Sequence, residues 1–183
     1  MKARKLKITE MDRLTLDTFK SAKKTALVVV LDNVRSLHNV GSVFRTSDAF
    51  LIEALYLCGI TDTPPNVEIH KTALGAEDAV EWTYFEDTHD AVRQLKADGY
   101  TVFAVEQAKG SVDLSALEPD KDGKYALVLG HEVKGVQQSV IDLCDQCLEI
   151  PQFGTKHSLN VSVTGGIVIW EFFKKLTAKV ISD

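Results

Sequence analysis

The sequence lacks an apolar segment long enough to cross a membrane. A spanning helix needs roughly 18 apolar residues in a row, and no uncharged apolar stretch of this 183-residue chain approaches that length. The first seven residues are basic, but Ile8-Thr-Glu-Met-Asp12 follows them in place of the apolar core of a secretory signal. We therefore expect a cytoplasmic protein that has no membrane partner.

Cysteine and proline are scarce, with three and four residues. Three cysteines do not build a disulfide scaffold, and Cys144-x-x-Cys147 has no second Cys or His pair at zinc-like spacing. We interpret these residues as ordinary reduced cysteines and expect no metal. No linker rich in Pro, Gly or Ser divides the chain, and its length fits one domain. We predict a basic, helical extension over residues 1–24 and one domain over residues 25–183.

An excess of positive charge is also missing, because the formal net charge is -5. Most affinity for nucleic acid comes from Lys and Arg side chains that neutralise phosphates, so an acidic chain is not an obvious binder of nucleic acid. The first 24 residues nevertheless hold eight basic residues against three acidic ones. Two interpretations stay open: a local basic face that meets a polyanion, or a solvated tail that aids solubility.

Strand and helix patterns alternate along the chain. The β-branched run Thr25 to Asp32 predicts a strand that is buried on both faces of a parallel sheet. A helix with Asn39 as its N-cap is expected to end near Ala49. Further strands are predicted over 54–58, 80–85, 100–105, 125–129 and 147–150, and further helices over 87–98, 136–143 and 160–176. This alternation predicts an α/β fold, a single domain with a mainly parallel sheet flanked by helices.

Two common nucleotide-binding fingerprints are absent. No G-x-G-x-x-G follows the first strand, which disfavours a dinucleotide site. Gly130 and Gly135 have the spacing of a phosphate-binding loop, but Val136 and Gln137 stand where such a loop has Lys and Ser or Thr. ATP binding is therefore not expected. What remains is a turn that presents one carboxylate, Glu132, which could also cap the following helix.

Three loops that follow predicted strands carry unusual polar residues. In open parallel sheets, ligands bind beyond the carboxyl ends of the strands, so these loops are the candidates for a site. The simpler alternatives are that Asn39 caps a helix, that Arg45 makes a surface ion pair, and that Ser158 and Asn160 cap the last helix. The loops in question follow Leu31, Leu129 and Ile150.

Taken together, the three loops resemble the motifs of the SpoU (TrmH-like) family of RNA 2'-O-ribose methyltransferases, in the SPOUT superfamily. The order and spacing of the motifs agree over roughly residues 26–173. The motifs are Asn39-x-Gly41-x-x-x-Arg45, Gly130-x-Glu132-x-x-Gly135, and Ile150-Pro151-x-x-Gly154 through Ser158-Leu-Asn-Val-Ser-Val163.

The resemblance implies a fold and an assembly that the residue pattern does not reveal. The C-terminal segment is expected to form a deep trefoil knot, a rare exception to normal connectivity. A homodimer is implied, with each active site near the interface. The final helix, with Val168, Trp170 and Phe173, is expected to help bury that interface.

The resemblance also implies a cofactor and an RNA substrate. S-adenosyl-L-methionine is expected to be held largely by backbone groups of the knot loops, at Leu129, Gly130, Ile150 and Leu159. Arg45 is the matched catalytic residue, either as a clamp on an RNA phosphate or as a base. The residues expected to position ribose, Arg45 and cofactor are Asn39, Glu132, Ser158 and Asn160.

The substrate is expected to be RNA, with tRNA favoured over rRNA because only about 25 residues precede the first strand. Arg35, His38, Lys5 and Lys7 are predicted to contact it. The alternative function is a catalytically inactive RNA-binding module of the same fold. Retained Asn39, Arg45, Glu132, Ser158 and Asn160 argue against that alternative.

Overall fold

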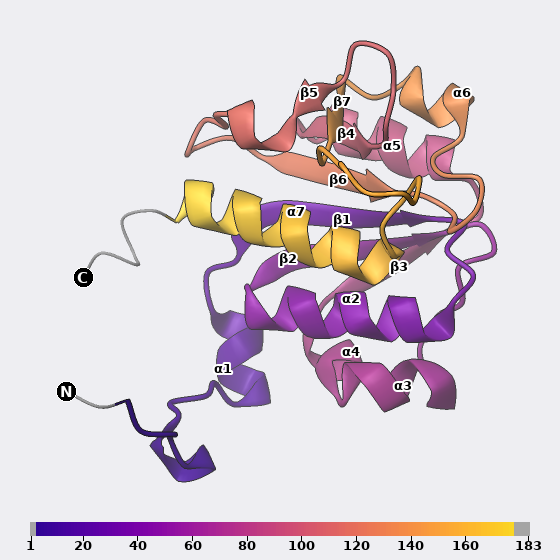
Figure 1. Cartoon of the computed structure of the whole chain (residues 1–183). Helices are drawn as coiled ribbons and strands as arrows, with labels where there is room; N and C mark the ends of the chain where they lie inside the picture. The colour runs from indigo at the N-terminus through magenta and orange to yellow at the C-terminus, as the bar shows by residue number, and fades with distance from the viewer. Residues whose placement is uncertain (1–2, 178–183) are drawn as a thin grey trace.

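A seven-stranded parallel sheet forms the middle layer of the computed structural model, which describes residues 3–177 (Figure 1). Its strands follow the spatial order β3-β2-β1-β6-β4-β7-β5, and each neighbouring pair is parallel. The predicted α/β class is therefore confirmed, whereas the knot stays a prediction. The strands are β1 Thr25–Asp32, β2 Ile52–Cys58, β3 Trp82–Phe85, β4 Thr101–Val105, β5 Val112–Asp113, β6 Tyr125–Leu129 and β7 Gln146–Glu149.

Helices cover both faces of this sheet (Figure 1). The α-helices are α1 Leu16–Ser21, α2 Leu37–Ala49, α3 Val67–Ala73, α4 Ala76–Ala79, α5 Thr88–Ala97, α6 Gln138–Ile141 and α7 Val161–Leu176. Helices α2 and α7 lie side by side on one face, with α3 and α4 packed against α2, and α5 and α6 lie on the other face. Within the described residues, no helix has the length and apolar character needed to cross a membrane.

Strand β1 lies near the centre of the sheet and is buried on both faces, as predicted. Leu27, Val29 and Leu31 pack into the core under α2 and α7, while Val28 and Val30 pack into the core under α5. This alternation follows from the strand geometry, in which successive side chains point to opposite faces. The continuous apolar run therefore fills two hydrophobic cores at once.

Helix α7 packs one face against the sheet and leaves another face apolar but exposed. Phe172 is fully buried, and Gly165 lets the helix approach closely, because a Cβ there would lie 3.2 Å from Leu129 Cδ1. Val168 is also fully buried in this core, so the expectation that it faces a second copy is wrong. The apolar side chains that remain exposed on α7 are Val163, Ile167 and Trp170.

Several element boundaries differ from the sequence prediction. Helix α2 begins three residues earlier than expected, because Ser36 rather than Asn39 is its N-cap and its hydroxyl accepts from Asn39 N. Asn39 is thus inside the first turn, and its interpretation as a cap is wrong. Helix α6 is shorter than predicted, β7 begins and ends one residue earlier, and α3, α4 and β5 were not predicted at all. Residues 3–24 contain α1 and the short 3-10 helix Ile8–Glu10.

Candidate functional site

A cavity of about 560 Å³ opens beyond the carboxyl ends of β4, β6 and β7. Loops after these three strands and the first turns of α7 form its walls. A cavity at this edge of the sheet is where ligands bind in open parallel folds. Among the residues predicted to form the site, those that line it are Leu129, Gly130, Glu132, Ile150, Ser158 and Leu159.

The loop from Gly130 to Gly135 folds back on itself at the mouth of this cavity. His131 and Gly135 form an antiparallel bridge, with Gly135 N donating to His131 O at 2.8 Å. A Cβ on Gly130 would lie only 2.2 Å from the carbonyl carbon of Gly135 and from Val136 N. Glycine is therefore required at position 130 by this close backbone approach.

Glu132 joins this loop to the start of α2. Its carboxylate accepts hydrogen bonds from Ser36 N at 2.8 Å, Arg35 N at 3.1 Å and Asn39 Nδ2 at 3.1 Å. Burial raises the pKa of Glu132, but these donors outweigh burial and hold the pKa below its ordinary value. Glu132 thus binds the backbone just before α2 and the Asn39 side chain in its first turn, and the alternative that it caps the helix following it in sequence is wrong.

Asn160 ties the third loop to the same cluster. It is the N-cap of α7, where its Oδ1 accepts from Ser162 N at 2.9 Å. Its Nδ2 donates to Asn39 Oδ1 at 3.1 Å. Since Asn39 also donates to Glu132, one chain of side-chain hydrogen bonds, Glu132–Asn39–Asn160, connects the loops that follow β1, β6 and β7. We call these three residues the tri-loop network.

Arg45 lies apart from this network. Its side chain is exposed on α2 and borders a separate cavity of about 440 Å³, together with Lys71 and Thr72 of α3. Within residues 3–177, Arg45 makes neither a side-chain hydrogen bond nor an ion pair, so the surface ion pair considered from the sequence is not found. Its guanidinium is therefore available to an external anion, but it does not reach into the large cavity of its own chain.

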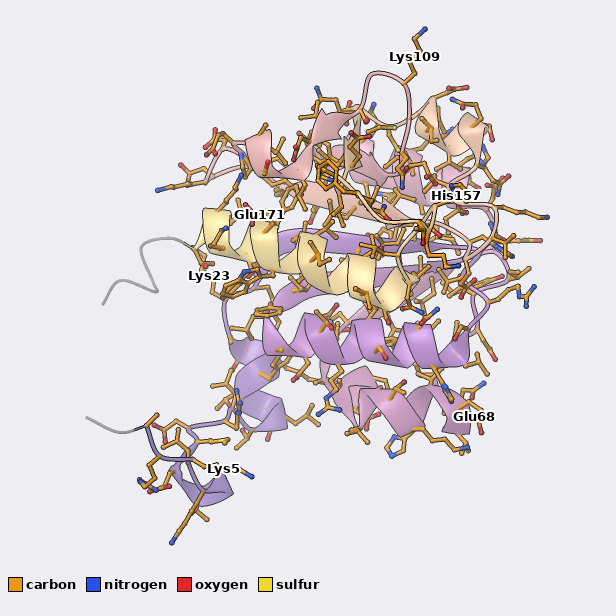
Figure 2. All side chains as sticks on the ribbon, in the orientation of Figure 1. Lys5, Lys23, Glu68, Lys109, His157 and Glu171 are labelled. Carbon is orange, nitrogen blue, oxygen red and sulfur yellow. The ribbon has the colours of Figure 1, made fainter. Side chains whose placement is uncertain are left out.

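The predicted RNA contacts are not gathered in one place. Arg35 is exposed beside Glu132, and the exposed His38 lies 3.4 Å from Glu68. Lys5 and Lys7 are exposed in the N-terminal segment. In Figure 2, Lys5 lies at the opposite end of the molecule from His157, which lines the large cavity. Lys5 and Lys7 therefore do not adjoin the candidate site of the same chain.

Glu106 is a site residue that the sequence interpretation missed. It follows β4 directly and lines the cavity. Its carboxylate accepts from Val136 N at 3.0 Å and from Gln107 N at 2.9 Å, and so supports the turn at Gly135. The sequence feature that could have identified Glu106 is its position directly after a buried strand, β4. The predicted site loops are only those after β1, β6 and β7.

In a comparison with protein-family models, residues 26–170 match the SpoU rRNA methylase family. The chain belongs to this family. The prediction of an RNA methyltransferase is therefore confirmed at the level of the family.

Curated SpoU relatives include enzymes named for two kinds of RNA. A tRNA (guanosine(18)-2'-O)-methyltransferase of Thermus thermophilus is 30% identical over 166 residues, which cover 89% of this chain and 82% of the relative. A 23S rRNA (guanosine-2'-O-)-methyltransferase of Xylella fastidiosa is also 30% identical, over 161 residues. That match covers 88% of this chain but only 64% of the relative, so this chain spans less than two thirds of the rRNA enzyme.

Solved structures of SpoU proteins share the fold. The A. aeolicus TrmH/SpoU tRNA modifying enzyme superposes with a TM-score of 0.79 at 25% identity. The match covers 91% of this chain and 84% of the A. aeolicus chain. An AdoMet-bound rRNA methyltransferase from Sinorhizobium meliloti superposes with a TM-score of 0.77 at 28% identity, covering 86% of this chain and 60% of its own. That structural neighbour was solved with AdoMet, which is the cofactor expected for this chain.

Proposed function

We propose that this protein transfers a methyl group from S-adenosyl-L-methionine to a ribose 2'-OH of RNA. The observation that carries the proposal is the cavity of about 560 Å³, which contains all four residues assigned to the cofactor loops and adjoins the tri-loop network. Its volume lies within the roughly 300 to 1,000 Å³ typical of ligand pockets.

The cavity offers backbone groups to a cofactor. Within residues 3–177, the loop and cap hydrogen bonds leave the backbone groups of Gly130, Ile150 and Leu159 unused. Backbone groups without an internal partner are commonly satisfied by ligands or water. Gly130, Ile150 and Leu159 would therefore hold the cofactor, which supplies a methyl group on a sulfonium when bound.

The chemistry requires orientation of a poor nucleophile. A ribose 2'-OH reacts in line with a methyl donor only when both are held in place and the hydroxyl proton has an acceptor. Asn39, Glu132 and Asn160 fix the three loops relative to one another, and Ser158 presents an exposed hydroxyl at the cavity. A guanidinium is almost always protonated, so Arg45 most simply grips the RNA phosphate next to the reacting ribose.

We also propose that the active form is a homodimer. Arg45 does not line the cavity of its own chain, so a second copy would have to bring its Arg45 to that cavity. The exposed apolar face of α7, formed by Val163, Ile167 and Trp170, gives such a copy a surface to bury. In this proposal the site is complete only at the interface.

tRNA is the proposed substrate class. The relative named for tRNA matches 166 residues, and the relative named for rRNA matches 161 residues at the same identity. Incubation of total tRNA and rRNA with labelled S-adenosylmethionine, followed by mapping of the modified ribose, tests the substrate. Label only in rRNA would contradict the tRNA proposal. Binding of S-adenosylhomocysteine without any methyl transfer would instead favour the inactive RNA-binding module.

Gly130→Ala is expected to weaken S-adenosylhomocysteine binding by at least about tenfold, because its Cβ would displace backbone atoms of the Gly130–Gly135 turn. Isothermal titration calorimetry measures the effect. Thr83→Ala, at an exposed position on the edge strand β3, is the control. Equal affinities of the two variants would show that the turn does not shape the cofactor site.

A further inference from the structure

Three lysines lie at or next to the large cavity: Lys109 and Lys134 line it, and Lys156 directly precedes its lining residue His157 in the sequence. Lys109 lies in the loop after β4, Lys134 in the loop after β6, and Lys156 in the loop after β7. All three side chains are exposed, and Figure 2 shows Lys109 projecting outward from the tip of its loop. None of the ion pairs found in residues 3–177 includes them. We call Lys109, Lys134 and Lys156 the cationic rim.

The acidic residues near this rim are bound elsewhere. Glu106 accepts from Val136 N and Gln107 N, and Glu132 accepts from the start of α2. Glu149 accepts from Ser111 Oγ at 2.6 Å. Their oxygens therefore face internal donors, whereas the rim ammonium groups extend into solvent. An acidic protein thus presents a local set of free cations at its candidate site.

An aromatic ring stands on the same border. Phe153 is 97% exposed in the loop after β7, and Gln152 and His157 of this loop line the cavity. The space beside the next residue is also open, since a Cβ at Gly154 would meet no atom within 4 Å. Almost no atom of residues 3–177 packs against this ring, so core packing does not explain why a phenylalanine stands at this position.

We propose that Phe153 and the cationic rim bind a single-stranded segment of the substrate RNA beside the reacting nucleotide. In this arrangement Phe153 stacks on an unpaired base, while Lys109, Lys134 and Lys156 contact phosphates on either side. Sequence-tolerant binding of single strands combines these two features, an aromatic platform and a groove of cations. The proposal rests on the proposed function and names how its RNA is held.

The surroundings favour RNA over a second copy of the chain at this border. A symmetric contact through the rim would bring like charges of two copies together, which is unfavourable. The exposed face of α7, with Val163, Ile167 and Trp170, offers an uncharged alternative for the copy. The rim is therefore the part of the site that suits a polyanion.

The test compares two charge-matched triple variants of the full chain. K109Q/K134Q/K156Q removes the rim, and K96Q/K121Q/K124Q removes three exposed lysines elsewhere on the chain. Fluorescence anisotropy with a labelled single-stranded RNA 12-mer, measured across salt concentrations, reports the affinity. We expect the rim variant to lower the slope of log Kd against log salt by about 2, at about 0.7 per lost phosphate contact. The K96Q/K121Q/K124Q control is expected to keep the wild-type slope.

Phe153 is tested by substitution with and without a ring. Phe153→Ala is expected to weaken 12-mer binding by about tenfold, as loss of one stacked base does, while Phe153→Tyr keeps wild-type affinity. Tyr84→Ala, which removes a half-exposed ring on β3, is the matched control and is expected to keep wild-type affinity for the 12-mer. The effect should be smaller for a duplex of the same length, whose bases are already stacked.

Three results would overturn the inference. The first is wild-type RNA affinity in both the Phe153→Ala and the rim variants. The second is an equal loss of RNA affinity in the K96Q/K121Q/K124Q control, and the third is a monomeric Phe153→Ala protein in light scattering, which would assign the ring to an interface between copies. Failure of the proposed function is distinguished separately, because the wild-type protein would then show neither S-adenosylhomocysteine binding nor methyl transfer.

Discussion

The Arg45→Ala variant is expected to lose methyl transfer by at least about 100-fold while it folds and binds S-adenosylhomocysteine like the wild type. A charged group that acts on the reacting centre contributes about 10² to 10³ to the rate. The Arg45 side chain is exposed and makes no hydrogen bond or ion pair within residues 3–177, so its removal leaves no internal partner unsatisfied. Activity and stability should therefore separate cleanly at this residue.

Two further variants sharpen the Arg45 experiment. Arg93→Ala is the matched control, since Arg93 is an exposed arginine that, among the described residues, pairs only with Asp90 on the same helix, and exposed pairs of this kind contribute little. Arg45→Lys tests whether charge alone suffices, because lysine cannot form the two parallel hydrogen bonds of a guanidinium with a phosphate. Full activity of Arg45→Ala would remove the residue from the mechanism.

Mixing of two inactive variants tests the homodimer proposal directly. In a mixed dimer of Arg45→Ala and Glu132→Ala chains, one of the two sites combines an intact Glu132 with an intact Arg45 from the other copy. A 1:1 mixture that exchanges freely should therefore recover about a quarter of the wild-type activity. No recovery, together with demonstrated exchange, would mean that Arg45 serves the site of its own chain.

Glu132→Ala is expected to lower the free energy of unfolding by about 2 kcal/mol and methyl transfer by at least about 100-fold. Removal of the carboxylate leaves Ser36 N, Arg35 N and Asn39 Nδ2 without their acceptor, and an unsatisfied donor costs about 1 to 3 kcal/mol when buried. Asn39 is then free to move, and misplacement of a positioning group by about 1 Å costs about 100-fold in rate. Urea unfolding and initial-rate kinetics measure the two effects.

The pH dependence of unfolding gives Glu132 a signature of its own. Because its pKa is lowered in the folded protein, its stabilisation is complete above the pKa of an unfolded glutamate, about 4.3, and is lost as the pH falls through the lower folded value. The difference in stability between wild type and Glu132→Ala should shrink below about pH 4. Glu86→Ala, at an exposed carboxylate after β3, should track the wild type at every pH. A constant difference down to pH 2 would rule out ionised Glu132 as the source of the stabilisation.

Local pattern was sufficient to predict most of the sheet but not the way its loops meet. Strand β1 is an unbroken β-branched run, and its predicted bounds are confirmed. Helices α3 and α4 were missed because they are short and follow a loop with two prolines, where helical periodicity is too brief to read. The motif residues identified Asn39, Glu132 and Asn160, whereas their hydrogen bonds to one another span more than 90 residues of sequence and depend on tertiary packing.

The separation of Arg45 from the large cavity was likewise beyond local pattern. Asn39 and Arg45 lie six residues apart on α2, yet one is buried against the network and the other is exposed beside α3. Six residues rotate a helix by about one and two thirds turns, so the two side chains diverge. Gly41, between them, is required by the close packing of α2 on α3, because a Cβ there would lie 2.2 Å from Ile69 O.

The strand order has a consequence for how the chain acquires its structure. Strand β6 inserts between β1 and β4, and the β1–β6 pairing joins Leu27 to Tyr125 and Leu31 to Leu129, about 100 residues apart in sequence. Such distant parallel pairing raises contact order and slows folding. During synthesis, β1, β2 and β3 can associate as soon as they emerge, but the inner edge of β1 stays open until β6 has been translated. The nascent chain is therefore most vulnerable to aggregation at the stage when its N-terminal half has been made and this strand edge is still exposed.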